Sequence, residues 1–292
     1  GNSSGLAMTL GTTATLDASG NYWGSTSPAN VAGLVTGNVD YTPWLGGGTD
    51  NAPGFSGDFS ELWVDDDSPQ AGTSNRIQEG VDLVTASTVN IAAGTYDATI
   101  DIDTRTDINL VGADKTTTII KPSTTLPWGF SPYGTSRQAA LRVYNSTGID
   151  VSNLTFDYDL VKGNSIFGVL YWDSEGSLSN NIFKNMSADD ASGYYYEMIA
   201  YMRAPGYTDA ARAQISITDN TFAETGRVAL VTHDYLHTII SGNTFYKTIS
   251  DFGYAMEIGS QSTAAVSNNT IYGYNTPAAS DGSNSAGIYV EN

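Results

Sequence analysis

The feature that most constrains the fold is a six-residue pattern that recurs in the second half of the chain. Each copy has an apolar residue, two small or polar residues, Asn, a variable residue and a second apolar residue. The asparagines lie at positions 181, 220, 243 and 269, and an earlier copy has its Asn one place early, at 153. Repeats of about 20–50 residues indicate a solenoid. We expect one coil per repeat, of about 22–26 residues, with a loop near residues 204–207 in the longest interval.

Short strand-like runs surround these repeats. Apolar and polar residues alternate in 88–91, 99–102, 108–111 and 117–120, as they do in half-buried strands. One short helix is predicted near 75–84, where Ile77, Val81 and Val84 are spaced i, i+4, i+7. Without helical patterns between the strands, the sequence favours an all-β parallel β-helix over a doubly wound α/β fold.

The repeated asparagines are interpreted as fold-forming residues without chemistry. Asn tolerates left-handed backbone angles, so we expect each coil to turn at its Asn. Stacked asparagine side chains can hydrogen-bond from coil to coil, while the flanking apolar residues form a continuous core.

Residues 77–122 and the five repeats together resemble the right-handed parallel β-helix, or pectate-lyase-like, superfamily of secreted proteins. The resemblance covers most of 61–292. It implies right-handed coils with a short N-terminal cap helix. It implies no single activity, because the fold carries lyases, hydrolases, esterases, adhesins and phage fibres.

Charge and composition limit the partners. With 12 Lys+Arg against 31 Asp+Glu, the net charge is −19, which argues against nucleic acid and anionic membranes as partners. The chain has no Cys, which excludes disulfides and thiol chemistry. No apolar run is long enough for membrane insertion. Abundant Ser, Thr, Asn, Gly and Tyr favour an extracellular or cell-surface location.

The two ends of the chain look displaced. Residues 1–45 resemble the closing segment of a β-helix, and 46–60 are predicted to be a Gly-rich linker. Residues 61–292 read as a β-helix with an open C-terminal end, because 285–292 begin a new coil. If Gly1 followed Asn292, Asn21 would lie two coils of 22 residues after Asn269.

We therefore predict head-to-tail partners, either identical subunits joined by strand donation or tandem repeats of one polypeptide. The alternative is an arbitrary boundary within a multidomain surface protein. The predicted assembly residues are Asn21, Tyr22, Trp23, Trp44, Ile288 and Val290.

Alignment of the coils on their asparagines places Tyr171, Tyr201 and His233 on successive rungs. An outward ladder of this kind can stack on sugar rings, so it is the predicted carbohydrate-binding face. The alternative is that all three are ordinary sheet residues.

An enzymatic role is the less favoured hypothesis. The resemblance implies either calcium-binding acids with a basic residue, as in pectate lyases, or paired aspartates with a Gly-His-Gly segment, as in polygalacturonases. Neither set is intact. If the chain is a lyase or hydrolase, Arg203 or Arg227 with His233 are the candidate base and acid.

Two further sites follow from local motifs. Asp65, Asp66 and Asp67 form an acidic cluster that could bind calcium, the only cofactor expected, although a solvated turn explains it equally. Asn145 and Asn185 begin glycosylation sequons.

The sequence therefore favours an extracellular structural or adhesive protein, a unit of a filament, sheath or tandem β-helix array. A polysaccharide lyase or glycoside hydrolase and a non-catalytic carbohydrate-binding module are the two alternatives.

Overall fold

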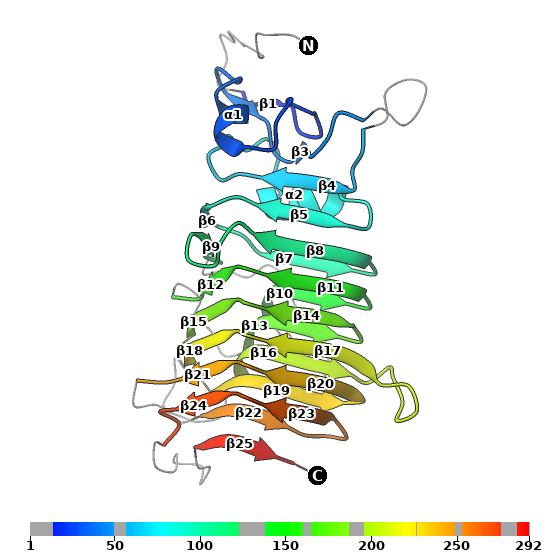
Figure 1. Cartoon of the computed structure of the whole chain (residues 1–292), viewed down its shortest axis with the longest axis vertical. Coiled ribbons are helices and arrows are strands. Elements are labelled where there is room, and N and C mark those ends of the chain that lie inside the picture. Colours follow the sequence, from blue (N-terminus) through cyan, green and yellow to red (C-terminus); the bar gives the residue numbers. More distant parts are fainter. Residues whose placement is uncertain are drawn as a thin grey trace.

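The strands stack into an elongated parallel β-solenoid (Figure 1). The structure, a computed structural model, describes residues 14–49, 57–122, 138–159, 165–186, 196–225, 227–248, 253–275 and 285–291. Within these ranges each coil from residue 88 onward contributes one strand to each of three sheets, in chain order. The prediction of an all-β parallel solenoid is confirmed. Residues 50–56 of the predicted linker lie outside the described residues.

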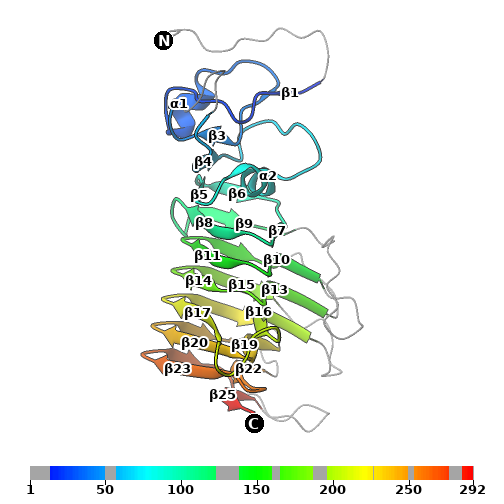
Figure 2. The ribbon, with the colours of Figure 1, turned by 90° about the vertical axis from the view of Figure 1, so that its right-hand side faces the viewer.

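The three sheets run along the length of the solenoid and are seen from a second side in Figure 2. Sheet 1 contains β7 (Ile100–Asp103), β10 (Gln138–Tyr144), β13 (Ser165–Trp172), β16 (Tyr196–Ala204), β19 (Val228–Asp234), β22 (Tyr254–Ile258) and β25 (Ala286–Val290). Sheet 2 contains β3 (Trp44–Leu45), β4 (Glu61–Val64), β5 (Thr88–Ile91), β8 (Thr106–Gly112), β11 (Thr147–Ser152), β14 (Gly176–Ser179), β17 (Ala213–Thr218), β20 (Leu236–Ser241) and β23 (Thr263–Ser267). Sheet 3 contains β6 (Gly94–Tyr96), β9 (Thr118–Ile120), β12 (Thr155–Asp157), β15 (Ile182–Met186), β18 (Thr221–Thr225), β21 (Thr244–Tyr246) and β24 (Thr270–Tyr272). The loop predicted near 204–207 connects β16 to β17.

The asparagine ladder forms the corner between sheets 2 and 3. The amide N–H of Asn181 donates to Oδ1 of Asn220 over 2.9 Å, and the amides of Asn220 and Asn243 donate in the same way to the next coil. Asn181, Asn220 and Asn243 are buried. Each therefore satisfies the backbone of the preceding coil, where an unpartnered buried amide would be costly.

The expected left-handed angle lies one residue earlier than predicted. The residues before the ladder positions have positive φ, namely Asn153, Asn180, Asp219, Gly242 and Asn268. The ladder asparagines themselves are not in this conformation. The reason is geometric: the left-handed residue makes the bend, and the next side chain is thereby directed into the corner. Asn153 is thus the bend residue of its coil, and Leu154 occupies the ladder position.

Aromatic rings continue the repeat into the core. Phe156, Phe183, Phe222 and Phe245 stack from coil to coil with ring centroids 5.3, 5.1 and 4.7 Å apart. All four are buried. Offset stacking adds to the burial of apolar area, so each coil stabilises the next.

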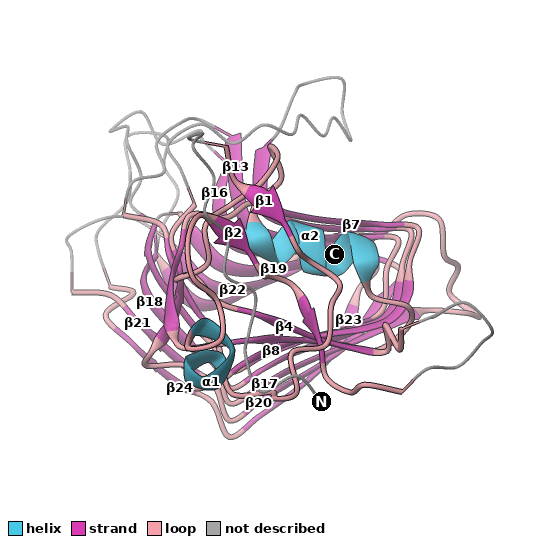
Figure 3. Cartoon of the chain, turned by 90° about the horizontal axis from the view of Figure 1, so that it is seen from above, coloured by secondary structure: helices cyan, strands magenta, loops and turns pink. Residues whose placement is uncertain are grey.

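The predicted helix is α2 (Arg76–Leu83), and Asn75 caps it by accepting the Gln78 amide. It packs against β4, β5 and β7, near the N-terminal end in Figure 1. Seen from above, α2 lies across the cross-section of the solenoid (Figure 3). Ile77 and Val81 are buried in the core. Neither helix in the described ranges has the length and hydropathy needed to cross a bilayer.

Residues 14–45 form a small separate layer at the N-terminal end, made of β1 (Leu16–Asp17), α1 (Pro28–Ala32), β2 (Val39–Asp40) and β3. β1 and β2 pair in parallel, with Leu16 opposite Val39. β3 pairs with β4 in the antiparallel sense. Val31, Tyr41 and Trp44 form the apolar cluster of this layer.

A buried carboxylate joins this layer to the solenoid. Asp40 is fully buried and accepts hydrogen bonds from the Thr42 amide and hydroxyl, from Ser68 Oγ over 3.0 Å, and from the Ala71 amide over 2.6 Å. A buried charge needs several such donors. The contacts span 28 to 31 residues of sequence, so they bring two distant segments together.

Candidate functional site

The outer face of sheet 1 carries a line of polar and aromatic side chains. Asp103, Tyr144, Trp172, Arg203 and His233 lie at one register position on five successive strands; we call them the outer row. The residues immediately before them on each strand are buried, and all but Thr232 belong to the apolar core. Because side chains alternate along a strand, the outer row points away from that core.

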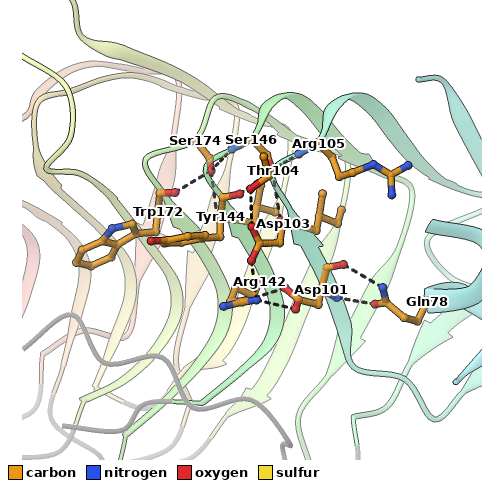
Figure 4. Close-up of polar contacts among 12 residues, drawn as sticks. Gln78, Asp101, Asp103, Thr104, Arg105, Arg142, Tyr144, Ser146, Trp172 and Ser174 are labelled. Carbon is orange, nitrogen blue, oxygen red and sulfur yellow. Dashed lines mark hydrogen bonds and ion pairs between the residues drawn. The ribbon is translucent and has the colours of Figure 1, made fainter. Parts of the chain in front are cut away.

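Ion pairs fill the N-terminal part of this face (Figure 4). Arg142 donates through Nε and Nη2 to the two carboxylate oxygens of Asp101 over 2.7 and 2.6 Å, and through Nη2 to Asp103 over 3.2 Å. Hydrogen bonding to Asp101 raises the pKa of Arg142 above its ordinary value. The Gln78 side chain bonds the Asp101 backbone, which ties α2 to β7. These groups are committed to one another, so this part of the face is structural.

Arg203 is held from two sides in the middle of the row. Its guanidinium forms a bidentate pair with the carboxylate of Asp234, and its Cζ lies 5.1 Å from the centroid of the Trp172 ring. Arg203 is only 7% exposed. Bidentate pairing and ring stacking suit the planar guanidinium, which remains charged at any ordinary pH. To act as a base, Arg203 would first have to lose a proton from its guanidinium.

A second carboxylate lies near this pair. Asp173 accepts the Gly206 amide over 2.6 Å. Burial raises the pKa of the Asp173 carboxyl above its usual value, and the charge of Asp234 adds to the rise, while the Gly206 hydrogen bond opposes it. A carboxyl with a raised pKa is a group that acid–base chemistry can use. Asp234 was not predicted as a site residue.

His233 ends the row beside a carboxylate. Its Nε2 lies 3.0 Å from Oε1 of Glu257 on β22, and the ring meets Tyr201 edge-on at 5.9 Å. Both His233 and Glu257 are about 15% exposed at the side chain. Glu257 was not predicted as a site residue, because it falls outside the asparagine repeats.

The predicted ladder of Tyr171, Tyr201 and His233 is wrong in register. Tyr171 pairs with Met202, and the residue opposite Arg203 is Trp172. Tyr171 is fully buried, and its hydroxyl donates to the Ile149 carbonyl over 3.0 Å, so it cannot stack on a sugar. The cause is a turn between sheets 1 and 2 that differs by one residue between coils, which counting back from the asparagines does not detect.

Tyr201 and Arg227 also differ from expectation. Tyr201 points outward but is only 4% exposed, because Phe167 stacks on it at 4.6 Å. Arg227 precedes β19, six residues from His233, or roughly 20 Å along an extended strand. The structure therefore brings Arg203 and His233 together and leaves Arg227 apart.

The acidic cluster lies in the turn after β4. Carboxylate oxygens of Asp65, Asp66 and Asp67 lie within 4.8 Å of one another. Burial raises the pKa of the Asp65 carboxyl. Asp66 accepts the Thr95 amide over 2.7 Å, and a Cβ on Gly94 would lie 2.1 Å from its carboxylate, so a side chain at position 94 would displace the Asp66 carboxylate. Calcium binding at this cluster stays a prediction.

The two sequon asparagines differ in accessibility. Asn145 is exposed at the turn after β10. Asn185, on β15, is half-buried, and its Nδ2 donates to Asp157 over 2.8 Å. Because Nδ2 is the atom that a glycan would modify, Asn145 is the better placed of the two.

The predicted assembly residues fall into two groups. Asn21, Tyr22, Ile288 and Val290 are exposed. Trp44 is fully buried, with its indole donating to the Ser25 carbonyl over 3.2 Å, and Trp23 packs beside it. Trp44 stacks on Trp63 of its own chain, so in the described residues its side chain stabilises the N-terminal layer from within, and a part in assembly stays a prediction.

Comparison of the sequence with protein-family models and with curated proteins gives no match.

Proposed function

We propose that this chain is a structural unit of an extracellular β-solenoid array, in which the last coil of one unit stacks on residues 14–45 of the next. The observation that carries the proposal is the coil geometry of this N-terminal layer. β1 and β2 pair in parallel at an offset of 23 residues, within the range expected for one coil. β1 is then the outermost described rung at this end, with one edge open to a neighbour.

The C-terminal coil offers a matching surface. Within the described residues, β25 pairs on one side only, with β22. Its apolar side chains Ile288, Tyr289 and Val290 are 46, 40 and 65% exposed. Exposed apolar residues on an open strand edge favour association with another strand. A further coil, from the same polypeptide or from another copy, would cover them.

A reversal of strand direction supports 1–45 as the closing segment of a separate β-helix. β3 and β4 are antiparallel, whereas the pairs on either side of them, β1–β2 and β4–β5, are parallel. The cluster around Trp44 is distinct from the main core. Right-handed coils, α2 as a cap helix and membership of the pectate-lyase-like superfamily also belong to the proposal. Secretion completes it, and the acidic, Cys-free composition supports this last part.

The test is the association state of the full chain. We expect sedimentation velocity and negative-stain images to show end-to-end chains that lengthen with concentration, and Ile288→Asp to disperse them, because it places a charge in the apolar contact. Ile239→Asp is the matched control: Ile239 is equally exposed, at 45%, but lies on β20 rather than on the last coil.

Monomers of the native chain at every concentration would exclude non-covalent stacking. A single polypeptide that contains two copies of the chain in tandem then tests whether the array is covalent. We expect its melting temperature to exceed that of one copy. Equal melting temperatures would contradict the array.

Carbohydrate binding is the second candidate, favoured by Tyr144, Trp172 and His233 on the outer row. Loss of glycan binding in Tyr144→Ala and His233→Ala, without product release, would support a binding module. Release of shortened or unsaturated sugars would support a hydrolase or lyase instead.

A further inference from the structure

We propose that His233, Glu257 and Glu291 form a binding site for a divalent transition-metal ion of the zinc class. Their ligand atoms, one imidazole nitrogen and two carboxylate oxygens, lie within 4.8 Å of one another. An imidazole with two carboxylates is a ligand set that zinc and its neighbours accept, whereas calcium prefers oxygen alone. We call these three residues the terminal site.

The backbone holds the three residues on consecutive coils. His233 lies on β19, Glu257 on β22, and Glu291 directly follows β25. The Gly259 amide donates to the Thr232 carbonyl over 3.0 Å, and the Glu291 amide donates to the Ile258 carbonyl over 2.9 Å. The site therefore depends on sheet 1 continuing through its last strand.

A glycine leaves space for the ion. A Cβ on Gly259 would lie 3.1 Å from Nε2 of His233 and 3.2 Å from Oε2 of Glu291. Both ligand atoms thus converge above a residue without a side chain. The 3.0 Å between Nε2 of His233 and Oε1 of Glu257 is close to the roughly 3.4 Å between adjacent ligands of a tetrahedral ion with bonds of about 2.1 Å, so a small separation of the two side chains would admit the ion.

The charge of the site favours a cation. Two carboxylates face one imidazole, and the nearest cation on the outer row, Arg203, is paired with Asp234. Tyr201 meets the imidazole edge-on and limits its rotation. A net charge of −19 further raises the local concentration of cations. Without metal, the His233–Glu257 hydrogen bond occupies the same atoms, so an ion would replace this bond.

Metal binding at the terminal site would stabilise the last coil. An ion bound by all three residues would join β19, β22 and the end of β25, of which β25 has the most exposed side chains. Binding to the folded state stabilises it by mass action. This inference is independent of the proposed array, because it concerns a single chain.

The experiment is titration of the full chain with ZnCl₂ and, separately, CaCl₂ by isothermal calorimetry at pH 7. We expect one zinc ion per chain and no saturable calcium binding at this site. His233→Ala and Glu291→Gln should each weaken zinc binding by at least about 10-fold, the loss already seen when only an outer-shell partner is removed. Glu291 is exposed, so its variant leaves the fold intact.

His237→Ala is the matched control. The chain has two histidines, and His237 lies on β20 with its Nδ1 2.9 Å from Thr263 Oγ1, outside the terminal site. Zinc should shift the imidazole NMR signals of His233 but not those of His237, and should slow amide exchange in β25. Absence of binding, or binding unchanged in both His233→Ala and Glu291→Gln, would overturn the proposal, as would equal loss in His237→Ala.

Discussion

The two ends of the solenoid are covered to very different degrees. At the N-terminal end, Trp44, Leu45 and Leu62 are fully buried, and the charged Asp40 is buried with them. At the C-terminal end, Val266, Tyr272 and β25 expose apolar side chains. The cover at the N-terminal end comes from residues 14–45, whose short strands β1, β2 and β3 differ from the strands of the repeat. The comparison shows how much apolar surface such a layer removes from solvent.

Truncation of a core side chain should reduce the stability of the fold most where coils lie on both sides of that side chain. Phe222 is stacked between Phe183 and Phe245, whereas Ile271 occupies the equivalent position in the last described coil of sheet 3. We expect Phe222→Ala to reduce the free energy of unfolding by about 4 kcal/mol and Ile271→Ala by about 1 kcal/mol. Urea denaturation measures both. Equal losses would show that the C-terminal end is as well packed as the interior.

Asp40 provides a test of how firmly the N-terminal layer is attached. Asp40→Ala leaves the Ala71 amide without its acceptor and leaves the Ser68 hydroxyl with the Pro69 carbonyl alone, so we expect a loss of about 3 kcal/mol. Limited proteolysis should then cut within residues 14–45 first. Asp17→Ala, an exposed acid of the same layer, is the control and should change little. Unchanged proteolysis in Asp40→Ala would mean that apolar packing alone holds the layer.

The asparagine ladder allows the interior of the solenoid to be compared with its C-terminal end, with smaller expected losses of stability. Asn243 bonds to coils on both sides, whereas Asn269 accepts from Asn243 and donates to the Ile240 carbonyl. We expect Asn243→Ala to cost about 2 kcal/mol and Asn269→Ala about 1 kcal/mol. Thermal melts of the two variants measure the difference. A larger loss at Asn269 would indicate that the last coil is already covered in solution.

The smallest expected effect is a pH dependence of the N-terminal end. Burial raises the pKa of the Glu79 carboxyl, and the charge of Asp40 adds to the rise, although a hydrogen bond from Gln70 opposes it. The folded state then binds this proton more tightly than the unfolded state. Stability should therefore rise on acidification from neutral pH toward the ordinary glutamate pKa, and fall as pH increases through the raised value.

Glu79→Gln should reduce this pH dependence, as seen in amide exchange of α2 between pH 7 and pH 5. Asp82→Asn, a change at an exposed acid of the same helix, should retain it. The same response in both variants would assign the effect to other groups.

The repeat within each coil could be read from the sequence. The apolar positions, the asparagine corner and the helix near 75–84 are local or periodic patterns, and backbone geometry converts them directly into a coil. Only the position of the left-handed residue was wrong, by one residue, because spacing alone does not separate the residue that bends from the one that it directs inward.

The tertiary structure alone decided which side chains meet across coils. A turn that differs by one residue moved Tyr171 into the core and placed Trp172 beside Arg203. Glu257 and Glu291 join His233 although 24 and 58 residues separate them in the sequence. Asp40 meets Ser68 and Ala71 in the same way. Such contacts depend on register between strands, and register is set by turn lengths and packing along the whole solenoid rather than by any local motif.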